Sequence, residues 1–131
     1  MKIQRSLATG LTLALITFAA LACSKGSNST PTATFQTFYN AVKNTDVNAI
    51  KSVMPKKNLD QAESEAKTKG IALDDSLKVE LKRMSTRLPA TMPEIRNEKI
   101  EGDKATLEFK DGEDWEKVGF IKEDDGWKLS R

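Results

Sequence analysis

The residue types that perform most catalytic chemistry are scarce in this chain. Its 131 residues include no histidine and a single cysteine, Cys23. Without histidine there is neither a Ser-His-Asp triad nor a histidine-ligated zinc site. The sequence also contains no glycine-rich phosphate-binding loop. The chemistry that remains is that of carboxylates and of aromatic side chains.

Three short groups of carboxylates stand out, and each has a simpler explanation than catalysis. The pair at 74–75 stands where a helix begins, and the pair at 124–125 stands in a turn. The run DGEDWE at 111–116 is acidic enough for calcium but lacks EF-hand spacing. The apolar stripes described below contain no acid, so a general acid–base pair has no inward-facing carboxylate. We therefore expect no enzyme activity, no metal site and no cofactor.

Three aromatic residues are the remaining candidates for ligand binding. Tyr39 lies on an apolar helical stripe and carries a hydroxyl that a cavity could use. Trp115 and Trp127 lie on two strands that we expect to be neighbours. Large aromatic side chains more often fill a core than line a pocket, and both alternatives stay open for these three residues.

Four helices are predicted before residue 90. The first begins at Pro31, the second follows the N-cap Asp46 and stops at Pro55, the third covers 58–69, and the fourth begins near residue 74. Apolar residues at helical spacing mark the first, second and fourth helices: Phe35, Phe38, Tyr39, Val42, Val47, Ile50, Val53, Met54, Leu77, Leu81, Met84 and Leu88. The third helix has few apolar residues and is expected to be peripheral.

Strands are predicted after residue 93, where the helical period ends. The first covers 94–101, with Ile95 and Ile100 as its apolar anchors, and turn signals separate it from three further strands. Trp115 and Val118 do not fit one alternation, which predicts a bulge between them. Helices followed by antiparallel hairpins indicate an α+β fold. We expect one domain at 31–131, in which N-terminal helices pack on a curved four-strand meander.

The first 23 residues follow a separate pattern. Lys2 and Arg5 precede an uncharged apolar run at 6–22, and small residues lead to Cys23. This pattern is typical of an export signal, and the run is shorter than the ~20 residues that span a membrane. Residues 20–23 resemble the lipobox of bacterial lipoproteins, with alanine at the position where leucine is usual. A plain secretory signal, which would leave a free thiol, is the alternative.

The lipoprotein resemblance implies where the protein acts. It implies cleavage after residue 22, a lipid of palmitate type on Cys23, and a polar tether at 23–30. The domain would then sit in the bacterial cell envelope, on the extracytoplasmic side. In a cell with two membranes the outer one is favoured, because Ser24 is not the aspartate that retains some lipoproteins at the inner membrane. The +2 net charge comes from Lys2 and Arg5 alone, so no nucleic-acid partner is expected.

Three stretches resemble the nuclear-transport-factor-two-like domains, and most closely the small lipoproteins of that superfamily that form a domain-of-unknown-function group. They are the helix pair from Phe35 to Ile50, the strand GDKATL at 102–107, and the terminal strand EDDGWKL at 123–129. The resemblance implies a cone-shaped roll, in which a curved sheet surrounds a helix-lined cavity. Two helices over 58–88 depart from the family pattern, which has a short strand and one helix there.

These observations favour a membrane-anchored binding or interaction domain without catalytic activity. The expected partners are the membrane, through Cys23, and an apolar small ligand, an envelope protein or a second copy of the chain. The alternative is a small cone-fold enzyme of isomerase, hydrolase or dehydratase type that acts on an apolar small molecule.

Overall fold

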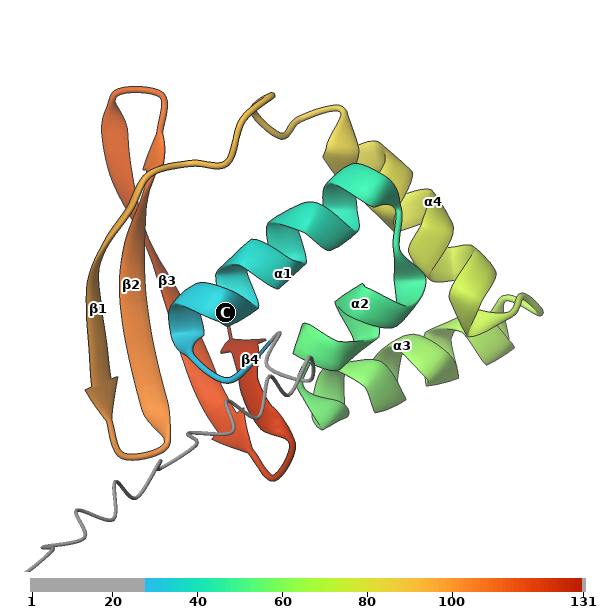
Figure 1. The fold of residues 1–131 in the computed structure, drawn as a ribbon. Coiled ribbons are helices and arrows are strands. Elements are labelled where there is room, and N and C mark those ends of the chain that lie inside the picture. The colour runs from blue at the N-terminus through green and yellow to red at the C-terminus, as the bar shows by residue number, and fades with distance from the viewer. Residues whose placement is uncertain (1–27, 131) are drawn as a thin grey trace, which may run out of the picture.

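The computed structural model describes residues 28–130, in which four helices precede four strands (Figure 1). The helices are α1 (Pro31–Asn44), α2 (Val47–Val53), α3 (Lys56–Thr68) and α4 (Leu73–Ser85). The strands are β1 (Ile95–Glu101), β2 (Lys104–Asp111), β3 (Asp114–Glu123) and β4 (Gly126–Ser130).

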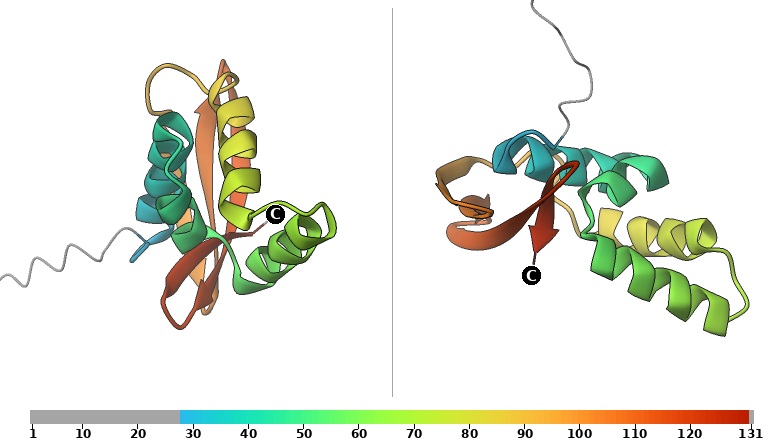
Figure 2. Two further views of the ribbon diagram at one scale, coloured as in Figure 1. Left: turned by 90° about the vertical axis from the view of Figure 1, so that its right-hand side faces the viewer. Right: turned by 90° about the horizontal axis from the view of Figure 1, so that it is seen from below.

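The strands form one antiparallel meander in the order β1-β2-β3-β4. The sheet twists and stays open at both edges (Figure 2). This arrangement of N-terminal helices on a curved four-strand meander confirms the predicted α+β fold class. The two helices expected across 58–88 are also present, as α3 and α4.

The helices cover one face of the sheet unevenly. Helix α1 packs against the sheet, α2 and α4 pack against α1, and α3 packs mainly against α4 (Figure 2). The buried residues between α1 and the sheet are Phe35, Ala105, Leu107, Phe120 and Trp127. Those between the helices are Ala41, Val42, Val47, Ile50, Val53, Leu77 and Leu81. Leu129 of β4 contacts both groups and joins them into a continuous core.

Local capping explains where the first two helices begin. The hydroxyl of Thr30 accepts a 3.0 Å hydrogen bond from the backbone N–H of Ala33. The carboxylate of Asp46 accepts one of 3.0 Å from Ala49 in the same way. Both residues satisfy a helix N–H that has no partner inside the helix. The predicted starts of α1 and α2 are therefore confirmed.

The bulge lies in β1, so its predicted place in β3 is wrong. Pairing of β2 with β3 is continuous, and Trp115 and Val118 consequently point to opposite faces of the sheet. The register instead shifts between Arg96 and Lys99, where Asn97 has a φ of 55°. Ile100 remains 52% exposed on this edge strand, so it does not act as the expected core anchor.

The folded part of the chain begins earlier than predicted. Asn28 was expected in the flexible tether, but only 8% of it is exposed. Its side-chain amide donates to the carbonyls of Asp125 and Ser52, and its own carbonyl accepts from the N–H of Trp127. The tether predicted at 23–30 thus ends before Asn28, because that side chain finds backbone partners on two other elements. Residues 1–27, including Cys23 and the predicted signal, lie outside the described residues.

Candidate ligand-binding groove

Two of the three aromatic candidates lie in the core. Tyr39 is 5% exposed, and its hydroxyl donates a 2.7 Å hydrogen bond to the carbonyl of Pro89. This bond ties α1 to the connection between α4 and β1. Trp127 is 3% exposed and packs with Phe35 beneath α1. Both side chains therefore fill the structure, and neither lines the groove described below.

Trp115 lies on the opposite face of the sheet from Trp127. The guanidinium carbon of Arg96 lies 3.7 Å from the centroid of a Trp115 ring, and Arg96 also pairs with Glu108 at 2.9 Å. Hydrogen bonds from Asn97 and Arg96 hold the pKa of the Glu108 carboxyl below its ordinary value. Stacking under a guanidinium gives the half-buried Trp115 a partner outside the core.

An apolar groove lies between the α3–α4 pair and the strands β3 and β4. Its inner part has a volume of ≈ 510 Å³, and apolar side chains form most of its floor. The floor residues are Phe38, Ile50, Val53, Leu77, Leu81, Met84, Val118 and Leu129. A pocket of this size with mostly apolar walls is typical of a small-molecule site.

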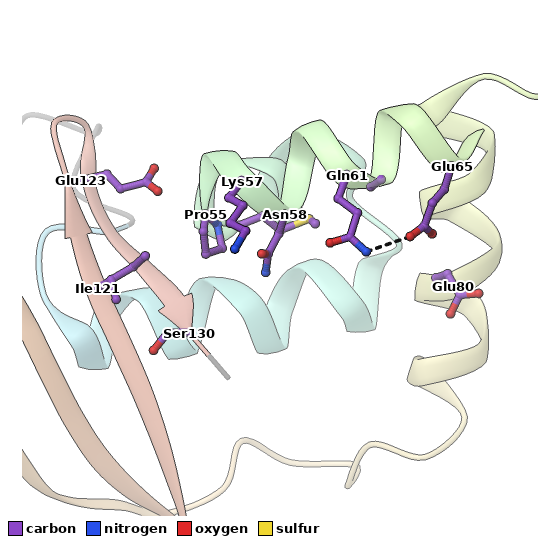
Figure 3. A pocket seen from close by; sticks show the side chains of 11 residues that line it. Pro55, Lys57, Asn58, Gln61, Glu65, Glu80, Ile121, Glu123 and Ser130 are labelled. Atoms are coloured by element: carbon purple, nitrogen blue, oxygen red, sulfur yellow. Dashed lines mark hydrogen bonds between the residues drawn. The ribbon is translucent and has the colours of Figure 1, made fainter. Parts of the chain in front are cut away.

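A more polar outer part of ≈ 750 Å³ adjoins the floor (Figure 3). The two parts share Met54, Pro55, Asn58, Glu80 and Ser130. Polar side chains of both signs stand around the opening, which we call the rim: Lys57, Asn58, Gln61, Glu65, Glu80, Lys117, Glu123 and Ser130. The amide of Gln61 donates to Glu65 at 2.9 Å. The groove is thus an apolar slot with hydrogen-bonding groups at its mouth.

Small residues and the thin apolar face of α3 explain why the groove is open. Ala66 is the only residue of α3 that is fully buried, and Ala62 projects only a methyl group toward the groove. On the facing strand, Gly119 has no side chain to fill the space, and a Cβ there would lie 3.0 Å from the Ser130 hydroxyl. The α3–α4 pair therefore lies opposite β3 and β4 without filling the space between them.

The hairpin between β3 and β4 holds one end of the groove in place. The carboxylate of Glu123 accepts hydrogen bonds of 3.1 and 3.3 Å from the backbone N–H of Lys56, the first residue of α3. This contact joins β3, which forms one wall of the groove, to α3, which forms another.

Lys128 is a buried charge that the sequence did not reveal. Only 3% of its side chain is exposed, and its ammonium donates to the carbonyl of Ser52 at 2.6 Å and to Asp125 at 2.8 Å. The Lys128 bond lowers the pKa of the Asp125 carboxyl. In the alternating pattern of β4, Lys128 occupies a position typical of a solvent-facing residue, but its ammonium bonds to the carbonyl of Ser52 in α2.

Buried polar side chains in the described part of the chain are all hydrogen-bonded. From Asn28 to Ser130, every buried side-chain nitrogen and oxygen has a hydrogen-bond partner. Over the same part of the chain, no three residues of the metal-ligating types gather into a site. No helix among these residues is long and apolar enough to cross a membrane.

Comparison of the chain with protein-family models, with curated proteins and with solved structures finds no match in any of the three. The likeness to nuclear-transport-factor-two-like domains and to lipoprotein signals therefore stays a prediction from the sequence.

Proposed function

We propose that this chain is a lipid-anchored envelope protein that binds an apolar or amphipathic small molecule in the groove, without catalysing a reaction on it. The observation that carries the proposal is the groove itself, with its apolar floor and polar rim. Such a site stabilises an alkyl or ring system on the floor and orients a polar end at the mouth.

The floor argues for binding rather than catalysis. All the floor residues named above are apolar, and the acid that lines the inner part, Glu80, stands at the rim. General acid–base catalysis needs an ionisable group within hydrogen-bond reach of the reacting atom. A cone-fold enzyme of isomerase, hydrolase or dehydratase type would have to work with rim carboxylates alone, and it remains the alternative.

The membrane part of the proposal depends on Cys23. A diacyl lipid on this residue anchors a protein stably, whereas one chain alone binds only marginally. Growth of expressing bacteria with labelled palmitate tests this directly. We expect label in the wild-type chain and none in Cys23→Ala. Equal labelling of both chains would contradict the anchor.

A matched pair of tryptophan variants tests the groove. Asn58 is exposed and lines both parts of the groove, so Asn58→Trp places a large side chain across its mouth. Ser64 is exposed on the same helix but does not line the groove, so Ser64→Trp is the control. The probe is cis-parinaric acid, a fluorescent fatty acid that reports apolar surroundings.

We expect saturable probe binding to wild type and to Ser64→Trp, and at least tenfold weaker binding to Asn58→Trp. Native mass spectrometry of the same samples should show one probe per chain. Equal binding by all three proteins would place the probe elsewhere and contradict the proposal. A dimer that blocks the probe would instead assign the groove to a second copy of the chain.

A further inference from the structure

The groove lies next to the point where the chain leaves the domain toward Cys23. Asn28 is held there by hydrogen bonds of 3.0 and 3.2 Å to the carbonyls of Asp125 and Ser52. A 2.9 Å bond from the N–H of Trp127 to its carbonyl fixes its backbone. Asn28 is therefore a fixed root for the tether.

Residues that line the groove lie close in the sequence to the residues that hold Asn28, the tether root. Met54 and Glu123 line the outer part of the groove, and each is two residues from a partner of Asn28. Two residues of extended chain cover about 7 Å at most. A charged hollow of ≈ 540 Å³ also includes Met54, Glu123 and Asp125, so surface depressions continue from the groove to the tether root.

The tether is too short to hold the groove far from a membrane. Cys23 and Asn28 are five residues apart in the sequence. At about 3.6 Å per residue, five residues span at most about 18 Å. With a lipid on Cys23, and with the Asn28 side chain and its hydrogen bond included, the end of the groove at Met54 and Glu123 stays within about 35 Å of the bilayer surface.

We propose that the ligand is the acyl chain of a membrane amphiphile, taken by the groove directly from the bilayer that holds the anchor. This inference rests on the proposed function and names the class and source of the ligand. Exposure of an acyl chain to water is unfavourable for every methylene, and a groove close to the bilayer shortens the path over which the chain is exposed. The rim carries Lys57 and Lys117 together with Glu65 and Glu80, and this mixture of charges suits a zwitterionic head group.

Photo-crosslinking in vesicles tests this inference on the full, lipidated protein. The vesicles are phosphatidylcholine with a few per cent of a phosphatidylcholine whose acyl chain ends in a diazirine. After irradiation, mass spectrometry maps the adducts on the protein. We expect adducts on the peptides that carry the groove floor in wild type and in Ser64→Trp. In Asn58→Trp we expect the floor adducts to fall at least tenfold.

A tether series separates membrane uptake from binding in solution. Insertion of 20 Gly/Ser residues between Gly26 and Ser27 lengthens the tether from five to 25 residues. Because a longer tether lets the groove move away from the bilayer, floor adducts should drop several-fold. Binding of cis-parinaric acid from solution should stay unchanged, since the groove itself is not altered.

The outcomes distinguish this inference from the proposed function. Floor adducts that do not depend on tether length would overturn direct uptake from the bilayer. Probe binding without any floor adducts would overturn the lipid ligand and leave the binding function standing. Loss of both signals in wild type would remove the proposed function itself. A dimer in native mass spectrometry, together with loss of the floor adducts, would make a second chain the occupant.

Discussion

Glu123 caps a helix that begins 67 residues before it in the sequence: its carboxylate accepts two hydrogen bonds from the backbone N–H of Lys56. Helix α3 follows Pro55, which supplies no side-chain cap. The hairpin between β3 and β4 thus provides the negative charge and the acceptor that the start of α3 lacks. One contact therefore positions both the helix and the end of the groove.

Substitution of Glu123 by alanine should destabilise α3 more than the rest of the domain. Loss of a helix cap costs about 1 kcal/mol, and α3 has little apolar burial to compensate. We expect faster amide hydrogen exchange in α3 and a lower urea midpoint. Glu116→Ala is the control, because Glu116 is an exposed acid on the same strand. Equal exchange in α3 of the two variants would show that the cap does not stabilise the helix.

The contribution of Asp125 to stability should disappear in acid. The hydrogen bond from Lys128 lowers the folded-state pKa of Asp125 below the ordinary value of 3.8. A group whose folded pKa is lowered adds stability above the unfolded pKa and loses it as the pH falls through the folded pKa. The stability that Asp125 contributes is therefore lost as the pH falls below about 3.8, the ordinary pKa of this carboxyl.

Urea denaturation of wild type and Asp125→Asn across pH 7 to pH 2 measures this dependence. The difference in unfolding free energy should be constant above about pH 5 and should shrink below about pH 4. Asp124→Asn serves as the control, because this neighbouring turn residue is exposed. The effect will be modest, since 72% of the Asp125 side chain is exposed and solvent screens the pair. A difference that grows in acid would contradict the assigned interaction.

Gly126 should tolerate alanine less well than Gly112 does. Gly126 has a φ of +123°, and a Cβ there would lie 2.7 Å from Cγ of Asn28. Gly112 has a φ of +63° and open space around it. We expect Gly112→Ala to cost about 1 kcal/mol from backbone strain alone. Gly126→Ala should cost about 2 to 4 kcal/mol, because it combines strain with a displaced tether root.

Chemical denaturation gives both values for the glycine variants, and amide exchange around Asn28 locates the damage. Equal costs for Gly126→Ala and Gly112→Ala would show that Asn28 is not held as the structure places it. A second change, Asn28→Ala in the Gly126→Ala background, should recover part of the loss if the clash is its cause.

The features that the sequence predicted correctly are local ones. Thr30 and Asp46 cap helices through bonds to residues three positions away, so their roles follow from short segments. The turn dipeptides similarly define the hairpins. The bulge was misplaced because Trp115 was assumed to share the core face, whereas Arg96 supplies its partner on the opposite face.

The groove and the buried lysine depend on contacts between distant segments. Lys128 looks like a solvent-facing strand residue until the end of α2 covers it, and its partner Ser52 lies 76 residues earlier. The groove likewise depends on where the peripheral α3 stands relative to Gly119 on β3. The pattern of residues within one helix or strand does not reveal which distant segment will pack against it, so these features appear only in the folded chain.

Affinity for unbranched fatty acids should rise with chain length and then level off. Each methylene that reaches the apolar floor contributes about 0.8 kcal/mol, which is about fourfold in Kd. Displacement of cis-parinaric acid by a series from octanoate to stearate measures this slope. The slope should end where the chain has filled the ≈ 510 Å³ inner part of the groove, because further carbons remain in water. Met84→Ala, which removes half-buried floor surface, should weaken the longer acids more than octanoate. A Kd that does not change with chain length would mean that the floor does not hold the alkyl chain.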